Sequence, residues 1–191
     1  MNIEHCITES IEVKRRMLED FHLIDTIEEV SFQAAEILKN KGRILLCGNG
    51  GSAADAQHIA AELSGRFMME REPLDAEALH VNTSYLTAVA NDYSYNDVYS
   101  RLVKAKGRQD DMLIAISTSG NSQNIINAVE AAKAIDMVTV GFTGEGGGKL
   151  RDLVNYLINV PSNETPRIQE AHILVGHIFC KLIEEKLFAQ K

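Results

Sequence analysis

Residues 45–62 read Leu45-Leu-Cys-Gly-Asn-Gly-Gly-Ser-Ala-Ala-Asp-Ala-Gln-His-Ile-Ala-Ala-Glu62, and this stretch predicts a strand, a glycine turn and a helix in succession. The apolar start favours a strand buried on both faces. The glycines that follow allow a tight turn, and Ser52 is a predicted N-cap for an alanine-rich helix. Such a turn favours anion binding, because free N–H groups and the helix dipole converge there.

His58 and Glu62 follow the turn at a spacing of four residues. This spacing places both side chains on one face of the predicted helix. The glycine turn is neither a P-loop nor a dinucleotide fingerprint, because it lacks the lysine of the first and the final spaced glycine of the second. An ordinary strand-to-helix turn, with a histidine and a glutamate on its polar face, is the competing interpretation.

Length and composition indicate a single globular domain. The chain has 191 residues, of which 45% are hydrophobic and 24% charged, and its net charge is −8. The negative charge argues against nucleic acid and anionic membranes as partners, and we expect no membrane span. Three scattered cysteines predict no disulfide framework, so a cytoplasmic location is expected.

Apolar spacing predicts two helices over residues 2–40, the second starting near Asp25 as its cap. From residue 43 onward, predicted strands and helices alternate. Strands are expected at residues 44–46, 78–81, 112–116, 138–142 and 155–160, and the last helix at residues 165–188. This alternation predicts a doubly wound parallel α/β sheet, in which ligands bind beyond the carboxyl ends of the strands.

A second polar turn, Ser117-Thr-Ser-Gly-Asn-Ser122, directly follows the strand predicted at residues 112–116. Its hydroxyls can donate hydrogen bonds beside backbone N–H groups, which suits a phosphate monoester without lysine or arginine. A serine-rich loop with one helix cap is the competing interpretation, although one cap does not need four hydroxyls.

With these motifs in hand, the chain resembles the sugar isomerase (SIS) domain family, and within it the bacterial phosphoheptose isomerases. The resemblance rests on Gly48–Ser52, Asn91-Asp92, Ser117–Ser122 and Arg167-Ile-Gln-Glu-Ala-His172, which match in order and approximate position. It covers nearly the whole chain and implies one SIS domain over residues 1–191, with residues 1–41 as an N-terminal helical extension. It also implies a five-stranded parallel sheet and a homotetramer with sites at subunit interfaces.

The resemblance assigns roles to individual residues. It implies a divalent metal, usually zinc, held by His58, Glu62, Gln169 and His177, with Glu62 and His177 as the acid/base pair. The implied substrate-binding residues are Asn49, Gly50, Gly51, Ser52, Glu62, Asn91, Asp92, Ser117, Thr118, Ser119, Ser122 and Gln169, and Arg66 is a further candidate. The implied reaction converts sedoheptulose 7-phosphate into D-glycero-D-manno-heptose 7-phosphate, an early step in making heptose precursors for lipopolysaccharide or other surface glycans.

These residue types suit ketose–aldose isomerisation, which needs a base beside a carbonyl, an acid at its oxygens and a held phosphate. One geometric point stands out. Gln169 and His177 lie eight residues apart, about 12 Å along a helix, whereas zinc bonds are about 2 Å long. We therefore expect that a neighbouring protomer supplies one of them, or that the helix is irregular near Gln169. His172, one turn from Gln169, is the alternative ligand.

Two other functions stay open at this point. One is a non-catalytic SIS protein, resembling the tetrameric relative that binds the bacterial replication initiator but lacks the acid/base pair. The other is an isomerase of another phosphosugar, such as a shorter ketose or an amino sugar. The presence of both Glu62 and His177 favours an enzyme.

Overall fold

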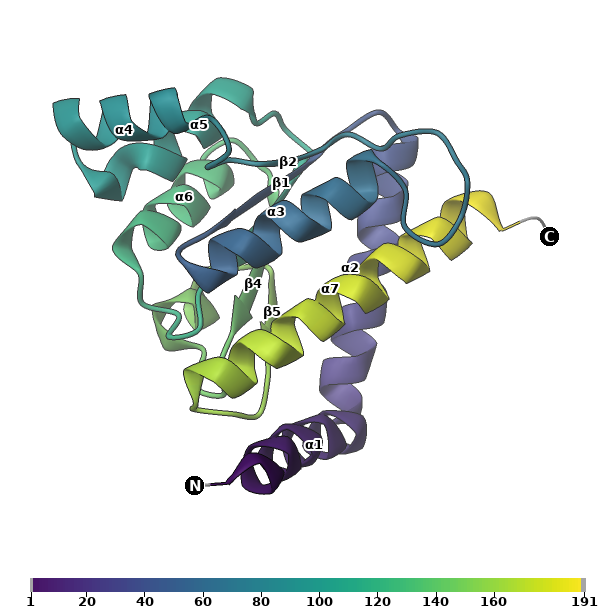
Figure 1. The fold of residues 1–191 in the computed structure, drawn as a ribbon. Coiled ribbons are helices and arrows are strands. Elements are labelled where there is room, and N and C mark those ends of the chain that lie inside the picture. The colour runs from purple at the N-terminus through teal and green to yellow at the C-terminus, as the bar shows by residue number, and fades with distance from the viewer. Residues whose placement is uncertain (1, 190–191) are drawn as a thin grey trace.

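The computed structural model describes residues 2–189 and has a five-stranded, all-parallel sheet in the order β2-β1-β3-β4-β5 (Figure 1). The strands are β1 (Ile44–Gly48), β2 (Ala76–Ala78), β3 (Met112–Ile116), β4 (Val138–Thr143) and β5 (Tyr156–Asn159). The α-helices are α1 (Ile3–Glu19), α2 (Phe21–Lys39), α3 (Gly51–Ser64), α4 (Thr83–Asp92), α5 (Val98–Lys106), α6 (Gln123–Lys133) and α7 (Thr165–Phe188). Two short 3₁₀ helices cover Tyr95–Asp97 and Gly148–Asp152.

The two faces of the sheet carry separate hydrophobic clusters, because successive side chains of a strand point to opposite faces. On β1, Ile44 and Leu46 pack with residues of α1, α2, α3 and α7. Leu45 and Cys47 pack on the other face with residues of α4, α5 and α6. Helices therefore cover both faces, and the predicted doubly wound α/β fold is confirmed.

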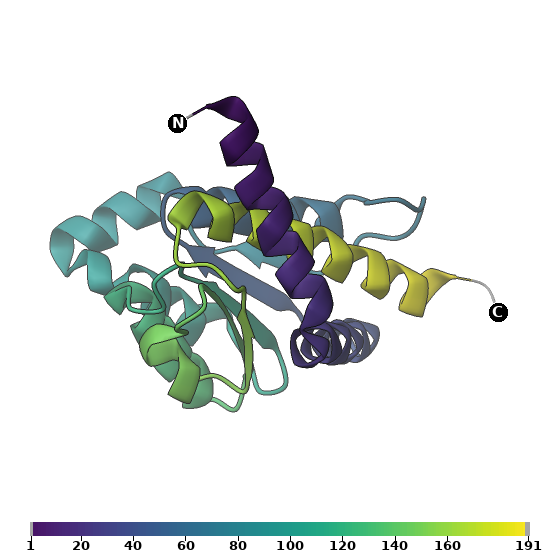
Figure 2. The same cartoon turned by 90° about the horizontal axis from the view of Figure 1, so that it is seen from below.

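The N-terminal helices pack on the α7 side of the sheet, and Figure 2 shows α1 running across α7. Asp20 is the N-cap of α2 and accepts the Leu23 N–H at 3.0 Å. The expected cap at Asp25 is therefore wrong, since Asp25 lies inside α2. Asp20 and Asp25 are both acidic residues that can cap a helix, and the structure uses the earlier one.

Two other local predictions need correction. Ser52 is not the N-cap of α3: Gly50 takes that place, and Ser52 is buried in the first turn. The strand expected at residues 78–81 lies at Ala76–Ala78, and a turn follows it. β2 is a short edge strand, so pairing with β1 rather than apolar composition sets its limits.

Within residues 2–189, none of the helices combines the length and the apolar character needed to cross a lipid bilayer.

Candidate active site

The two turns predicted from sequence lie next to each other at the carboxyl edge of the sheet. β1 and β3 are hydrogen-bonded neighbours, and Gly48 pairs with Ile116 at their carboxyl ends. The first turn leads into α3 and the second into α6. The N-caps of these helices, Gly50 and Ser122, make no side-chain capping bond. Among the described residues the N–H groups of Ser52 and Ala53 bond to backbone carbonyls, whereas those of Gly51, Gln123 and Asn124 do not, so the start of each helix offers an N–H group to an anion.

Glycines shape both turns. Gly50 has a φ of +56° and Gly120 a φ of +66°, a region that other residues rarely adopt. A Cβ at Gly120 would overlap the carbonyl group of Gly147, and one at Gly51 would overlap the side-chain amide of Gln169. The second overlap shows that Gln169 lies directly against the start of α3.

The hydroxyl groups of the second turn gather as predicted. The hydroxyls of Ser117 and Ser122 are hydrogen-bonded at 3.2 Å, and the Ser119 hydroxyl accepts the Asn121 N–H at 3.2 Å. Ser117 is buried, Thr118 and Ser122 are half-buried, and Ser119 is exposed. The turn therefore offers hydroxyls beside the open end of α6, an arrangement suited to phosphate.

Asn49 joins the two turns through its side chain. Its Nδ2 donates to Asn124 Oδ1 at 2.9 Å, and Asn124 Nδ2 donates back to Asn49 Oδ1 at 2.8 Å. The Tyr95 hydroxyl donates to the same Asn49 oxygen at 3.1 Å. The side chain of Asn49 thus fixes one turn against the other. Sequence analysis did not identify Asn124 and Tyr95 as residues of the site, although the sequence has Asn49 in the first turn and Asn124 just after the second.

His58, Glu62 and His177 form the second part of the site, which we call the histidine cluster. His58 Nε2 lies 3.0 Å from Glu62 Oε1 and 3.5 Å from His177 Nε2. One ligand atom from each residue lies within 4.8 Å of the others. The His58 side chain is 47% exposed and that of Glu62 25% exposed, so the cluster is open to a substrate.

The packing of α3 against α7 explains why these side chains meet. The two helices lie side by side (Figure 1). At their contact a Cβ on Gly176 would lie 2.5 Å from Ile59 Cδ1, so a larger residue there would force the Ile59 side chain to move. The residues next to this contact are His177 and His58, whose rings lie 5.1 Å apart at 71°.

Gln169 lies nearer the N-terminal ends of α3 and α7 than the histidine cluster does. α7 is one uninterrupted helix from Thr165 to Phe188, so the expected irregularity near Gln169 is wrong. Gln169 lies against Gly51, and His177 lies against His58, two turns further along both helices. The helical rise of about 12 Å between them therefore separates Gln169 from the histidine cluster along the helix axis.

Other predicted residues lie outside these contacts. Asn91 Nδ2 donates to Asp92 Oδ1 at 2.9 Å at the exposed end of α4, and Arg66 pairs with exposed Glu70 at 3.7 Å. His172 is fully buried, with Nε2 3.1 Å from the Thr143 carbonyl oxygen and its ring on Phe142. Burial lowers its pKa to about 4. The structure therefore directs His172 into the core, away from the histidine cluster.

The donor set of the histidine cluster fits a divalent metal. Two imidazole nitrogens and a carboxylate oxygen are ligands that zinc takes in catalytic sites, where a fourth position stays open. Asp55, one turn before His58 on α3, has a buried oxygen, Oδ2, with no hydrogen-bond partner in residues 2–189. Burial raises the pKa of Asp55, and the nearby His58 opposes this effect. A carboxylate beside a ligating histidine is a common outer partner of metal sites.

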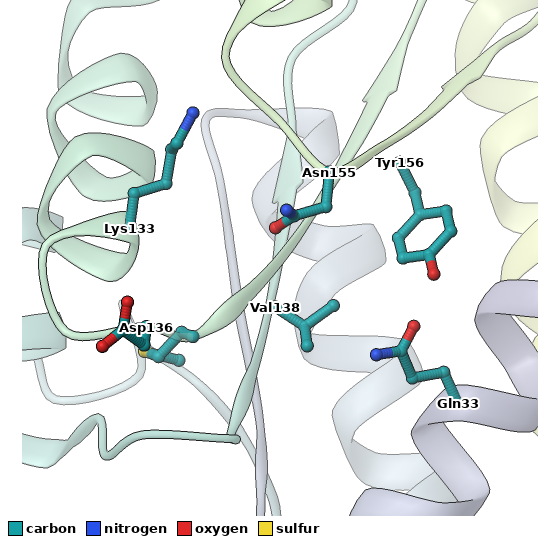
Figure 3. Close-up of a pocket in the computed structure, with 7 residues that line it drawn as sticks. Gln33, Lys133, Asp136, Val138, Asn155 and Tyr156 are labelled. Carbon is teal, nitrogen blue, oxygen red and sulfur yellow. The ribbon is translucent and has the colours of Figure 1, made fainter.

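A separate hollow lies at the opposite edge of the sheet (Figure 3). Its volume is about 540 Å³, and Val138 and Tyr156, which line it, begin β4 and β5. Lys133 Nζ already donates to the Leu153 carbonyl oxygen, and the Tyr156 hydroxyl donates to Glu29. Ligands of parallel α/β sheets bind at the carboxyl edge, so this hollow is not the candidate site.

Comparisons with known proteins agree with this fold. Residues 9–144 match the SIS domain family. The class of protein is therefore an SIS-domain protein, as the doubly wound sheet and the paired polar turns indicated.

Individual relatives narrow the class. A phosphoheptose isomerase of Aneurinibacillus thermoaerophilus is 52% identical over 189 residues, which are 99% of this chain and 96% of that protein. Solved phosphoheptose isomerases from Neisseria gonorrhoeae and Francisella tularensis have TM-scores of 0.90 and 0.92 and identities of 44% and 37%. Both comparisons cover 96% of this chain and 97% of the other. The chain belongs to the phosphoheptose isomerases, enzymes of the isomerase class within the SIS-domain family.

Proposed function

We propose that this chain isomerises sedoheptulose 7-phosphate to D-glycero-D-manno-heptose 7-phosphate. One observation carries the proposal: His58, Glu62 and His177 converge within 4.8 Å on two helices, and one of these helices begins at the phosphate-type turn. The names of the relatives support the same reaction class.

The dimensions of the site support a long sugar phosphate. Gly51 opens α3 and His58 lies seven residues later, which is about 10 Å along the helix axis. A substrate with phosphate at one end and a carbonyl at the other can place the phosphate at the two turns and the carbonyl at the histidine cluster. The phosphate thereby fixes the reacting end.

In the proposed mechanism Glu62 is the base and His177 the acid. Glu62 removes the proton from C1 of the ketose while His177 donates a proton to the C2 carbonyl oxygen, which gives an enediol. Glu62 then returns its proton to C2, and His177 takes the proton from the C1 hydroxyl as the aldehyde forms. Both groups end in their starting states, and each transfer is general acid–base catalysis.

We further propose that the histidine cluster holds zinc, with His58, Glu62 and His177 as ligands; Glu62 and His177 would each bind it through one atom and transfer protons through the other carboxylate oxygen or ring nitrogen. Bound zinc would polarise the carbonyl oxygen and favour the negative charge that develops there. Gln169 lies about two turns from the cluster along α7, so we assign it as a ligand only across a subunit interface, and otherwise as a substrate contact near Gly51.

The remaining assignments concern substrate contacts. Ser52, Ser117, Thr118, Ser119 and Ser122, with the backbone of residues 49–51, are proposed to bind the phosphate. Asn91 and Asp92 are exposed polar side chains that we assign to sugar hydroxyls.

We also propose a homotetramer with sites at subunit interfaces. The apolar residues Ile3, Ile7, Ile11 and Leu18 of α1 are 53% to 79% exposed, whereas Val13 and Met17 are buried against the domain. Water contact with such a stripe is unfavourable, which supports burial against another copy. Light scattering at several protein concentrations tests this assignment.

The chain is proposed to work as one SIS domain over residues 1–191, with residues 1–41 as a helical extension, in the cytoplasm. Its product would serve as a heptose precursor for lipopolysaccharide or other surface glycans.

Turnover of sedoheptulose 7-phosphate by the purified protein tests the proposal, with aldose formation followed before chelation, after chelation and after zinc is returned. We expect activity that chelation abolishes and zinc restores. Activity that persists after the metal is removed would contradict the role of zinc. Absence of turnover with any divalent metal would contradict the reaction, and ribulose 5-phosphate and amino-sugar phosphates would then be assayed.

A further inference from the structure

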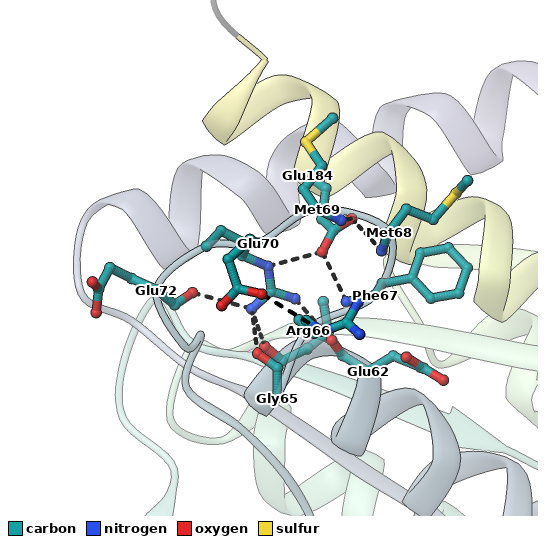
Figure 4. Close-up of polar contacts among 11 residues, drawn as sticks. Glu62, Gly65, Arg66, Phe67, Met68, Met69, Glu70, Glu72 and Glu184 are labelled. Carbon is teal, nitrogen blue, oxygen red and sulfur yellow. Dashed lines mark hydrogen bonds and ion pairs between the residues drawn. The ribbon is translucent and has the colours of Figure 1, made fainter.

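A buried ion pair links the loop after α3 to the last part of α7 (Figure 4). Arg71 Nε donates to Glu184 Oε1 at 2.9 Å, and both side chains are 1% exposed. Glu184 also accepts the backbone N–H groups of Phe67, Met68 and Met69 at 2.8 to 3.0 Å. Burial raises the pKa of Glu184, but these donors and Arg71 outweigh it and hold the pKa below its usual value.

The Arg71 guanidinium also closes the end of α3. Its terminal nitrogens donate to the carbonyl oxygens of Glu62 at 2.8 Å, Leu63 at 2.7 Å and Gly65 at 3.1 Å. The last carbonyls of a helix lack partners within the helix, and a cation there is favourable. Arg71 therefore fixes the backbone of Glu62, the proposed base.

Glu184 lies seven residues after His177 on α7. Seven residues are two turns, so both side chains lie on one face of the helix. The Arg71–Glu184 pair thus joins α3 and α7 two turns beyond the histidine cluster, and it sets how the two helices approach there.

Phe67 connects this pair to the cluster directly. Its N–H is held by Glu184 at 2.9 Å, and its ring stacks on the His177 imidazole with centroids 5.6 Å apart and planes at 17°. A stacked ring limits rotation of the imidazole, while His177 Nε2 faces His58 at 3.5 Å.

We propose that Arg71, Glu184 and Phe67 are positioning residues for the acid/base pair. The buried ion pair fixes the loop after α3, and this loop places the Phe67 ring against His177. Arg71 also fixes the end of α3, which carries Glu62. The inference rests on the proposed isomerase function, because it concerns the same Glu62 and His177. It differs from a purely structural role, which would affect folding but not the rate of folded protein.

Phe67→Leu tests the stacking without removing a buried charge. We expect kcat to fall about tenfold, because small misplacements of a catalytic group are costly, while KM stays within about twofold. Phe67→Tyr keeps the ring and should restore kcat. Wild-type kcat in Phe67→Leu would overturn the role of Phe67, and so would an equal loss in Phe67→Tyr.

Glu184→Gln tests the ion pair, with Glu185→Gln as the matched control. Glu185 is the next residue on α7, and among residues 2–189 its side chain makes an exposed ion pair with Lys181 at 3.8 Å. We expect kcat per folded molecule to fall at least tenfold in Glu184→Gln, with wild-type kcat in the control. The folded fraction is measured by circular dichroism at the assay temperature. A loss fully explained by unfolded protein would overturn the proposal.

A second readout keeps this test separate from the isomerase assignment. The second readout is the NMR chemical shift of the His177 imidazole C–H in metal-free protein, because it depends on the Phe67 ring stacked on it. The resonance is identified by its loss in His177→Gln. We expect this resonance to move in Phe67→Leu and Glu184→Gln but not in Glu185→Gln, and an unmoved resonance would overturn the proposal. Inactive wild-type protein with this expected pattern would contradict the function alone.

Discussion

Two polar clusters join α3 to α7, and they differ in exposure and in hydrogen bonding. In the histidine cluster, the side chains of His58 and Glu62 are 47% and 25% exposed, and the Nε2 atoms of His58 and His177 lie 3.5 Å apart. In the Arg71–Glu184 pair both side chains are 1% exposed, and Glu184 accepts from four N–H groups.

The difference shows that the same two helices, α3 and α7, carry reactive groups at the histidine cluster and a rigid, fully bonded contact at the Arg71–Glu184 pair. Groups that must bind a substrate or a metal need unfilled hydrogen-bonding capacity and access. Buried charges are tolerated only when partners satisfy them. We therefore expect changes in the histidine cluster to affect activity, and changes in the ion pair to affect both stability and the rate of the folded protein.

The largest expected effect is on catalysis. His177→Gln should lower kcat by about 10²- to 10⁴-fold, the usual contribution of a general acid or base, with an unfolding midpoint close to wild type. Steady-state assays and thermal melts at one protein concentration measure both. A variant with near-normal kcat would remove His177 from the mechanism.

The next effect is on stability. Glu184→Leu should lower the free energy of unfolding by about 3 to 5 kcal/mol, because it leaves Arg71 as an uncompensated buried charge. The double variant Arg71→Met, Glu184→Leu should not recover this loss, because the N–H groups of residues 67–69 and the carbonyls at the end of α3 stay without partners.

Urea unfolding measures these values, and His58→Asn is the matched variant from the histidine cluster. Its exposed contact with Glu62 should contribute less than about 0.5 kcal/mol. Recovery of stability in the double variant would show that the charges matter and the backbone contacts do not.

Part of the pH dependence of stability between pH 6.5 and 4 should come from His172. Its pKa is lowered from 6.5 to about 4 by burial, so the unfolded chain binds a proton in this range and the folded chain does not. Stability therefore falls as the pH decreases from 6.5, by up to about 3 kcal/mol near pH 4. His172→Gln should remove this part of the dependence in melts across the range, and an unchanged profile would contradict it.

The smallest effect concerns the phosphate turn. Ser122→Ala should raise KM about tenfold, because a hydrogen bond to a charged group contributes about 1.5 to 3 kcal/mol, and kcat should change little. Steady-state kinetics separate this pattern from that of His177→Gln. An unchanged KM would remove the Ser122 hydroxyl from phosphate binding.

Much of the fold could be predicted from sequence because its signals are local. Apolar runs marked β1 and β3, and the glycines and hydroxyls of the two turns fall directly after them. β2 and the start of α2 were misplaced, since an edge pairing and the Asp20 cap decide them.

The site was predictable only where residues of one turn or one helix carry it. The spacing of His58 and Glu62 places them together, but the approach of His177 depends on contact between Gly176 and Ile59. Asn124, Phe67 and the Arg71–Glu184 pair lie far apart in the sequence from the residues they contact. Periodicity carries no information about such contacts.

The most direct test of the central claim is the initial rate of aldose formation from sedoheptulose 7-phosphate by Glu62→Gln and wild-type protein under identical conditions. The account predicts a measurable wild-type rate and a loss of about 10²- to 10⁴-fold in the variant. A Glu62→Gln rate close to wild type would contradict the claim that the histidine cluster carries out the proton transfer.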